Sequence, residues 1–271
     1  MIIDEDKIKE MLPSEFKFLS ENEIERLYCL FDFFYKWFYR CIDGDIKHVK
    51  SYHNAFYFLV NELIGKLVSE YFGDTHVKSE VVREYNTGIF YLISDNFIKD
   101  GFKYSYLNNE MFNSLNLKKF NNNVSMLEKI DNLEFKKEDL IELKSDLKRM
   151  VVCDFICNCY DRAFRNFMVG FNSDRVKLMP IYDFEFSFKQ GYSNYPNVFS
   201  FNFQNLSELE YIRNDEEFQK LFYMASDLDM RDIIEKFHDI YPIRLDKEEI
   251  RKYMYVVLNK QDEIRERRLI K

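Results

Sequence analysis

The stretch CNCYDRAFRNFMVGFNSDRVKLMPIYDFEFSF, residues 157–188, contains the pattern that decides the fold prediction for this chain. Its runs NFMVGF and RVKLMPIY are rich in apolar and aromatic residues, and the NSD between them is typical of a turn. We therefore expect two short strands joined as a hairpin. In a hairpin, the residue before the first strand lies about one strand spacing from the residue after the second. The sequence thus predicts that Asn166 and Asp183 lie at the same end of this hairpin.

A helix is expected to lead into the hairpin. The residues KKEDLIELKSDLKRMVVCDFICNCY, at 136–160, become continuously apolar toward their end. Such a helix is exposed at first and buried later, and we expect it to end near Asp161. Asp161 then lies on the loop between helix and hairpin. Three oxygen-bearing side chains, those of Asp161, Asn166 and Asp183, are predicted to converge there.

This set of side chains suits phosphoryl transfer. Mg²⁺ prefers a carboxylate and an amide oxygen together with phosphate oxygens, while a separate carboxylate can accept a hydroxyl proton and orient the nucleophile. We assign Asp161 as the catalytic base, Asn166 as a metal ligand, and Asp183 as the main metal ligand that bridges the phosphates. The alternative is that Asp161 caps a loop and Asp183 occupies a turn, because Asp and Asn are frequent in this chain.

The residues before position 100 mix strands with a helix. NAFYFLVNELIGKLVSEYFG, from Asn54, has apolar residues at helical spacing, and Gly73 is a natural stop. Two β-rich runs over 77–94, separated by YNTG, predict a hairpin. Residues 20–42 open like a capped helix, but the aromatic run after that opening suits a helix and a strand equally.

The pattern turns helical from about residue 107. Four segments read as amphipathic helices with acidic starts: NLSELEYIR, DEEFQKLFYMAS, DMRDIIEKFHDI and DKEEIRKYMYVVLNKQDEIRERR. The predicted fold is therefore α+β, with a small mixed α/β lobe over residues 1–100 and a larger, mainly helical lobe over residues 101–271. The boundary is expected near 97–107.

The amino-acid composition bears on the kind of protein and on its possible partners. Apolar residues form 46% of the 271, which predicts a globular chain. The net charge of −8 argues against a broad basic face for nucleic acid, so no direct nucleic-acid contact is expected. The N-terminus is acidic, and the aromatic run YCLFDFFYKWFYR is too short to span a bilayer. We expect a soluble cytoplasmic protein with no membrane partner.

The cysteines give no metal motif. They are Cys29, Cys41, Cys153, Cys157 and Cys159. An odd number without matching pairs fits a reducing compartment and makes a structural zinc site an unlikely reading of CDFICNC. Cys157 and Cys159 are interpreted as small buried residues rather than reactive ones.

The same stretch resembles the catalytic segment of the HipA-like serine/threonine kinases, which have a protein-kinase-like fold that is also similar to lipid kinases. The family pattern is Asp-x6-Asp-Arg-His-x-x-Asn, a hairpin, and then Pro-x-Tyr-Asp. It is matched by Asp154, Asp161, Arg162, Asn166, Pro180, Tyr182 and Asp183. A weaker similarity extends over residues 36–190. The resemblance implies a two-lobed kinase-like fold with ATP and Mg²⁺ as cofactors.

The chain departs from the family pattern at defined positions. Ala163 replaces the usual His, Cys159 replaces a common Asn, and no Gly-rich phosphate loop is visible.

For the nucleotide, the resemblance places Arg40, in WFYR, where the family has a phosphate-binding Lys. Glu62 is the candidate partner of that cation, or else a solvated helix residue. The hinge-like ISDNF implies nucleotide contacts near Leu92 and Ser94. The alternatives to Arg40 are Lys36, Lys47 and Lys50.

The resemblance thus implies an ATP- and Mg²⁺-dependent kinase that phosphorylates a Ser or Thr hydroxyl of a protein. It also implies toxin–antitoxin biology, with a helix-turn-helix antitoxin or a separately encoded N-terminal subdomain as partner. One alternative is a kinase-fold pseudokinase that binds a nucleotide or a partner without catalysis. Another is a kinase of small molecules or lipids.

Overall fold

The computed structural model describes most of the chain from residue 123 onward and shorter ranges before it. The described ranges are 16–18, 37–41, 46–52, 56–74, 76–83, 90–95, 102–105, 123–160, 162, 167–189, 203, 205–241 and 243–271. They fall into two compact units. The first is drawn from Met1–Leu59 and Val77–Asp100, and the second from Val60–His76 and Gly101–Lys271. Each unit is described by itself below.

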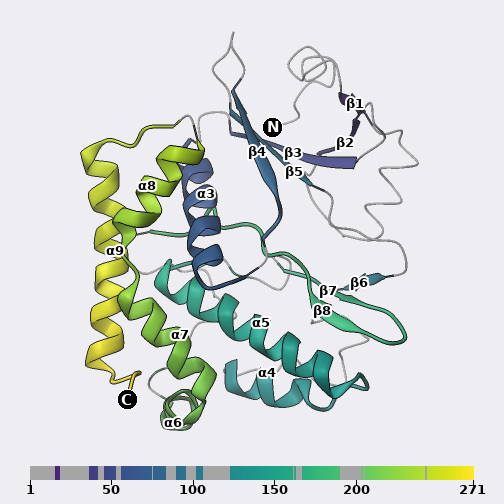
Figure 1. The fold of residues 1–271 in the computed structure, drawn as a ribbon, viewed down its shortest axis with the longest axis vertical. Coiled ribbons are helices and arrows are strands. Elements are labelled where there is room, and N and C mark those ends of the chain that lie inside the picture. The colour runs from purple at the N-terminus through teal and green to yellow at the C-terminus, as the bar shows by residue number, and fades with distance from the viewer. Residues whose placement is uncertain are drawn as a thin grey trace. The chain divides into compact units, whose positions relative to one another are not determined.

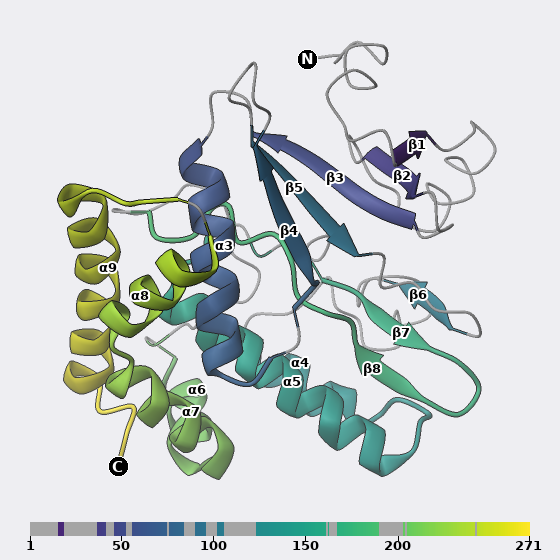
Figure 2. The same cartoon turned by 45° about the horizontal axis from the view of Figure 1, so that its top comes forward.

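The first unit contains an antiparallel sheet in the order β1-β2-β3-β5-β4 (Figure 2). Its strands are β1 (Phe16–Phe18), β2 (Trp37–Cys41), β3 (Ile46–Tyr52), β4 (Ser79–Arg83) and β5 (Phe90–Asp95). The predicted hairpin over 77–94 is confirmed, because β4 pairs with β5 with Val81 opposite Leu92. The aromatic run within residues 20–42, which suits a helix and a strand equally, ends in strand β2.

Helix α3 (Phe56–Tyr71) begins in the first unit and continues through the second. Every residue from Leu59 to Ser69 is buried, so the helix is enclosed rather than amphipathic. It ends at Tyr71, two residues before Gly73, the stop that the sequence predicts, and the φ of 80° at Gly73 is one that glycine adopts without steric cost.

Helix α5 (Lys137–Ile156) is exposed in its first turn and buried from Leu147 onward, apart from Arg149 and Phe155, which are half-buried. The predicted end near Asp161 is wrong by a few residues. The helix stops at Ile156 because Asn158 has a left-handed backbone, with φ of 48°. The Asn158 amide donates to the carbonyl oxygen of Lys189 at 2.6 Å, which ties the helix end to the segment after the hairpin.

The hairpin predicted from the opening stretch is present as β7 (Val169–Phe171) and β8 (Val176–Leu178). Asn172 makes its turn, because its side-chain oxygen accepts from the N–H groups of Asp174 and Arg175. A strand not expected from the sequence, β6 (Lys103–Ser105), pairs with β7 and gives the order β6-β7-β8. The hairpin packs against α5.

The second unit is otherwise helical. Besides α3 and α5 it contains α4 (Asn123–Ile130), α6 (Leu206–Asn214), α7 (Glu216–Asp227), α8 (Met230–Ile240) and α9 (Lys247–Glu266). The four predicted C-terminal helices are all confirmed. Their first turns are capped by the side chains of Asn205, Asp215, Asp229 and Asp246, each accepting a backbone N–H.

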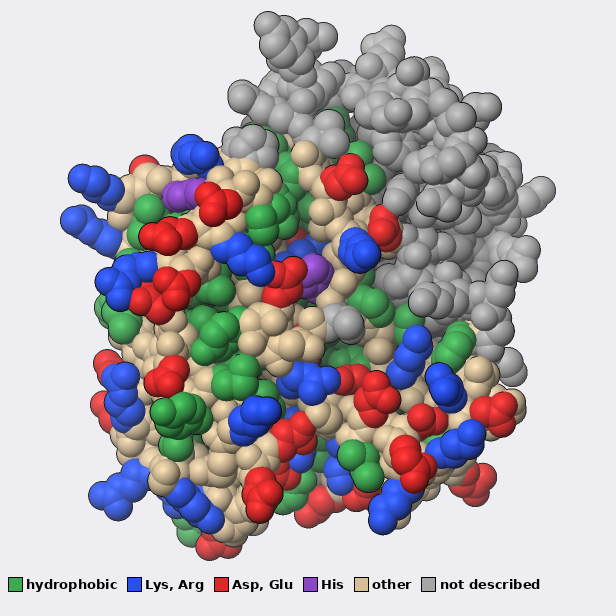
Figure 3. All heavy atoms as spheres, in the orientation of Figure 1, with side chains coloured by type: hydrophobic (Ala, Val, Ile, Leu, Met, Phe, Trp, Pro, Cys, Tyr) green, Lys and Arg blue, Asp and Glu red, His purple; other side chains and the backbone are tan. Residues whose placement is uncertain are grey.

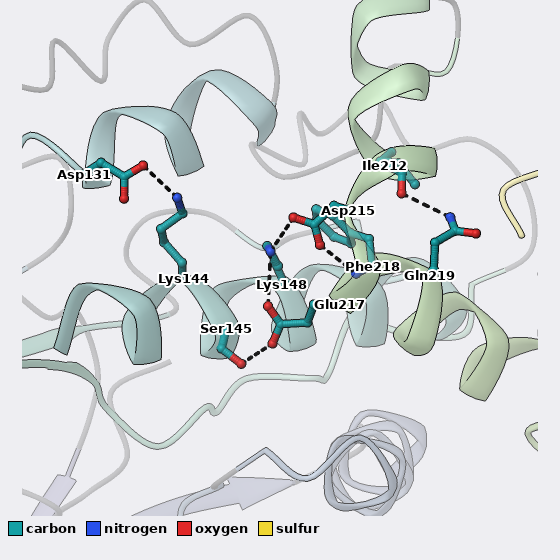
Figure 4. A network of polar contacts seen from close by, with 9 residues as sticks. All are labelled: Asp131, Lys144, Ser145, Lys148, Ile212, Asp215, Glu217, Phe218 and Gln219. Carbon is teal, nitrogen blue, oxygen red and sulfur yellow. Dashed lines mark hydrogen bonds and ion pairs between the residues drawn. The ribbon is translucent and has the colours of Figure 1, made fainter. Parts of the chain in front are cut away.

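Helices α5 and α7 pack side by side and share a polar network (Figures 1 and 4). Lys148 lies 2.6 Å from the Asp215 carboxylate and 3.1 Å from that of Glu217. Asp215 also caps α7, and Ser145 donates to Glu217. Because the ammonium group of Lys148 is nearly buried, these carboxylates compensate for its loss of water.

The described part of the chain is thus mixed α/β, with antiparallel sheets and seven helices. None of its helices is long and apolar enough to cross a membrane. Figure 3 shows acidic and basic side chains interspersed over the described surface on the face drawn, without a broad field of one sign. The predicted division at residue 100 into two lobes stays a prediction.

Candidate metal and catalytic site

Of the three side chains predicted to converge at the hairpin, Asp183 lies within the described residues and Asp161 and Asn166 lie outside them. The segment that carries Asp183 follows β8 and runs against α3. Ile181 forms a parallel bridge with His76, just beyond the end of α3. The convergence of all three oxygens therefore stays a prediction, while the setting of Asp183 can be built from its contacts.

Asp183 has a left-handed backbone with φ of 69°. This region is sparsely populated by residues other than glycine, and surrounding contacts must hold a residue there. The N–H of Asp183 donates to Oε1 of Glu62 at 3.3 Å, and the N–H of Phe184 donates to Oε2 of the same carboxylate. Two successive backbone N–H groups thus form a small anion-binding concavity, and Glu62 supplies the anion.

Arg162 holds the same segment through the preceding residue. Its guanidinium donates to the carbonyl oxygen of Tyr182 at 2.6 Å and lies over the ring of Phe184 at 4.8 Å. Two further bonds of 2.9 Å run to the two carboxylate oxygens of Asp154 on α5. Arg162, which follows the predicted base directly, therefore connects helix α5 with the segment of Asp183.

The pair of Arg162 and Asp154 is fully buried. Burial raises the pKa of Asp154 even though the guanidinium opposes that shift. Burial also works against the charge of Arg162, but the carboxylate of Asp154 overcomes it and raises the pKa of Arg162. The guanidinium and the carboxylate face each other in a bidentate geometry, which gives two parallel hydrogen bonds. Cys159, which replaces a common Asn of the family, also hydrogen-bonds to Asp154.

Helix α3 also contacts the segment of Asp183 through Asn61 and Gly65. Asn61 donates to the carbonyl oxygen of Glu185 at 2.8 Å, and its own oxygen accepts from the hydroxyl of Tyr253 on α9 at 2.9 Å. Gly65 faces Phe184 so closely that a Cβ there would lie 2.5 Å from the Phe184 Cβ. The absence of a side chain at Gly65 is what allows this approach.

Glu62 also has a cation on its own helix. Lys66 lies one turn further along α3, with its Nζ 3.4 Å from Glu62 Oε1, and both side chains are almost fully buried. The alternative that Glu62 is a solvated helix residue is therefore wrong. Its predicted pairing with Arg40 is untested, because the Arg40 side chain lies outside the described residues.

The remaining predicted nucleotide residues lie in the first unit. Leu92 and Ser94 are buried on β5, opposite Lys50 and His48 of β3 respectively. Arg40 pairs with Ile46 in the sheet register. Of the alternative cations, Lys50 lies 5.9 Å from the ring centre of Tyr52, Lys47 is on β3, and Lys36 lies outside the described residues. Contacts to a nucleotide from these positions stay predictions.

The magnesium ion that the kinase reading requires stays a prediction, because of its two predicted ligands Asp183 is described and Asn166 is not. Among the described residues there is no group of three or more His, Cys, Asp or Glu side chains that would form an all-protein metal cage. A magnesium ion that is carried with a nucleotide needs no such cage, since it takes one or two protein oxygens and keeps phosphate and water as its other ligands. The Asp183 carboxylate is one such donor. Cys153, Cys157 and Cys159 are buried and take part in no disulfide, and the burial of Cys157 and Cys159 was predicted.

Several residues of this site were missed by sequence reasoning. They are Asn61, Gly65 and Lys66 on α3, and Tyr253 on α9. A signal for the first three was present, because polar residues and a glycine interrupt an otherwise apolar helix at NELIGK. No local pattern marks Tyr253, since its role depends on a contact between residues distant in sequence.

Comparisons with known proteins support a kinase fold. No protein-family model and no curated protein sequence matches the chain. Among solved structures, it is similar to the Helicobacter pylori proinflammatory kinase CtkA, with a TM-score of 0.59 and 12% identity over 84% of this chain and 90% of that one. It is also similar to the Shewanella oneidensis toxin HipA, solved with HipB and operator DNA. That match has a TM-score of 0.52 and 12% identity over 83% of this chain and 60% of HipA.

The chain therefore has the fold shared by HipA and the CtkA kinase, and the resemblance predicted from the residues around Asp183 is confirmed at that level. The likeness is one of fold, and a fold does not by itself establish an activity. At such low identity, the activity, the substrate and the partners of those proteins do not transfer to this chain by similarity alone.

Proposed function

We propose that the chain is an ATP- and Mg²⁺-dependent HipA-like kinase that phosphorylates a Ser or Thr hydroxyl of a protein. The observation that carries the proposal is the setting of Asp183. Its backbone is held left-handed at the end of the hairpin, with Arg162 on the preceding carbonyl and Glu62 on the following amides. In the kinase family that this stretch resembles, the metal-binding carboxylate follows such a hairpin.

In the proposed reaction, Asp161 accepts the proton of the substrate hydroxyl. The hydroxyl oxygen forms a bond to the γ-phosphorus of ATP, the bond from that phosphorus to the bridging oxygen breaks, and ADP leaves. Asn166 and Asp183 hold the magnesium ion, which neutralises negative charge on the phosphates when it is bound. Arg162, the residue after Asp161 in the sequence, connects helix α5 to the segment of Asp183 through its contacts with Asp154 and Tyr182.

The nucleotide is proposed to bind to the small lobe predicted over residues 1–100, while residues 101–271, the predicted helical lobe, carry the catalytic and metal-binding residues. In this proposal Leu92 and Ser94 contact the nucleotide, and Arg40 holds its phosphates where relatives use a lysine. Arg is bulkier than Lys but presents a planar fork of donors that matches phosphate oxygens. Lys36, Lys47 and Lys50 are the alternatives to Arg40.

A toxin–antitoxin role is part of the proposal. The HipA structure contains HipB and operator DNA. By analogy, a small helix-turn-helix protein or a separately encoded N-terminal subdomain is the proposed partner of this chain. Because that structure contains DNA, it does not support the prediction that this chain makes no direct contact with nucleic acid.

Transfer of γ-labelled phosphate tests the proposal. The protein is incubated with labelled ATP and Mg²⁺, alone and with cell lysate, as the wild type and as Asp161→Ala and Asp183→Ala. Label on a protein that disappears in both variants supports the kinase. Nucleotide binding without transfer would instead identify a pseudokinase, and transfer only to a lipid or metabolite would replace the protein substrate.

A further inference from the structure

Helix α3 contains a buried ion pair whose position is not explained by packing. Glu62 and Lys66 are one helical turn apart, 3.4 Å from each other, with side-chain exposures of 4% and 3%. Their neighbours Leu59, Leu63 and Leu67 are apolar and buried. A buried pair costs more desolvation than apolar residues of similar size, so it is weak evidence of stabilisation by itself.

Within this pair, Glu62 contacts the backbone of the Asp183 segment. Both oxygens of Glu62 accept N–H groups, one from Asp183 and one from Phe184. Lys66 is placed at the i+4 position C-terminal to the glutamate, the orientation in which such a pair is favourable. Its ammonium group lies beside Oε1 of Glu62, and the two oxygens of that carboxyl group accept one N–H group each.

This arrangement accounts for the left-handed backbone of Asp183. A residue with a side chain is strained at a φ of 69° and persists there only where surrounding contacts hold it. The two N–H bonds to one carboxylate require adjacent amides to point the same way, which is the geometry of an anion-binding concavity. If the carboxylate is removed, the amides lose their common acceptor and the backbone can relax to a negative φ.

We propose that Glu62 and Lys66 are a positioning pair that sets the direction of the metal-binding carboxylate of Asp183, which rests on the proposed function for the role of Asp183. In this proposal Glu62 acts through the backbone N–H groups of Asp183 and Phe184. The pair is built from one helix of the second unit. It therefore needs no cation from the sheet of the first unit, unlike the predicted pairing of Glu62 with Arg40.

The experiment compares Glu62→Gln and Lys66→Met with Lys148→Met as the matched control. Lys148 is another nearly buried lysine in an ion pair, 2.6 Å from Asp215. Its polar network joins α5 and α7 and consists of residues outside the Asp183 segment (Figure 4). All three variants are expected to lose stability in urea. The comparison then separates a general loss of stability from an effect on Asp183.

Two readouts are made on the full chain. The first is residue-resolved amide hydrogen exchange at Asp183 and Phe184 without ligand. The second is the affinity for Mn²⁺, as a probe for Mg²⁺, measured by electron paramagnetic resonance with a non-hydrolysable ATP analogue. We expect Glu62→Gln and Lys66→Met to lose amide protection and to weaken Mn²⁺ binding by about 10- to 100-fold, the range for residues that orient a ligand. Lys148→Met should keep both.

The inference is overturned if Glu62→Gln keeps the protection of both amides, or if it keeps the Mn²⁺ affinity of the wild type. It is also overturned if Lys148→Met weakens Mn²⁺ binding as much as Glu62→Gln does. A wild-type protein that binds no Mn²⁺ with nucleotide present would overturn the proposed function instead. The exchange result would then decide alone whether Glu62 fixes the backbone of Asp183.

Discussion

At the scale of single residues, the buried guanidinium of Arg162 is the centre of the candidate site. It contacts Asp154, the carbonyl of Tyr182 and the ring of Phe184, which belong to a helix and to the segment after a hairpin. Because it has no exposure to water, its charge depends on these partners. The arginine of the Asp-Arg pattern that suggested catalysis therefore also connects helix α5 to the segment after the hairpin.

Replacing Asp154 with Ala should destabilise the fold by about 3–5 kcal/mol, because it leaves the Arg162 charge buried without its carboxylate. The measurement is urea unfolding followed by circular dichroism. Asp262→Ala is the control, since Asp262 forms an exposed pair with Arg265, in which both side chains are at least 60% exposed. That change should stay within about 0.5 kcal/mol. Equal losses in the two variants would contradict a structural role for the buried pair.

Gly65→Ala should destabilise the second unit although alanine is the better helix former by about 1 kcal/mol. The new Cβ would lie 2.5–2.8 Å from three side-chain atoms of Phe184, so the ring must move away from α3. Overpacking of this kind costs about 1–3 kcal/mol. Thermal unfolding of the variant tests this, and a melting temperature at or above that of the wild type would contradict the close packing.

At the scale of elements, α3 and α5 are joined by charges at the end of α3. Asp74, just past that helix, lies 3.2 Å from Arg149 on α5, and the guanidinium also contacts Asp146. Burial raises the pKa of Asp74 to about 7, against the opposing effect of Arg149, and burial raises that of Asp146 to about 6. Two carboxylates thus share one cation, in a place poor in water.

Because the pKa values of Asp74 and Asp146 are raised in the folded protein, the free energy of unfolding should fall as the pH rises. A carboxyl whose pKa is higher in the folded state than in the unfolded one binds its proton more tightly when folded, so stability falls between about pH 4 and about pH 7. Each such group contributes a slope of at most about 1.4 kcal/mol per pH unit. Asp74→Asn should flatten the slope, as measured by urea unfolding over this range. An unchanged slope would show that Asp74 titrates normally.

Most elements could be predicted because their signals are local. Asp caps followed by apolar residues at helical spacing marked α7, α8 and α9, and a turn sequence between β-rich runs marked both hairpins. The end of α5 was predicted too late because the apolar run continues through Cys157 and Cys159. Those residues are buried outside the helix, on either side of Asn158 with its left-handed backbone.

At the scale of the whole molecule, the opening motif was sufficient to predict the kind of fold, which the similarity to CtkA and HipA supports. It was not sufficient to predict how Asp183 is held. The contacts of Glu62 with Asp183, and of Asn61 with Glu185 and Tyr253, join residues more than a hundred positions apart. Such pairings leave no periodic trace in a sequence, so they become visible only once the chain is folded.

The central claim is that this chain transfers the γ-phosphate of ATP by way of Asp161 and Asp183. The most direct test is phosphate addition detected by mass spectrometry after incubation with ATP and Mg²⁺, in the wild type, Asp161→Asn and Asp183→Asn. We predict Mg²⁺-dependent phosphorylation of a Ser or Thr by the wild type and a loss of at least about 100-fold in each variant, the lower range for a positioned acid–base group. Phosphorylation that persists in both variants, or a wild type that binds ATP without transferring its phosphate, would contradict the claim.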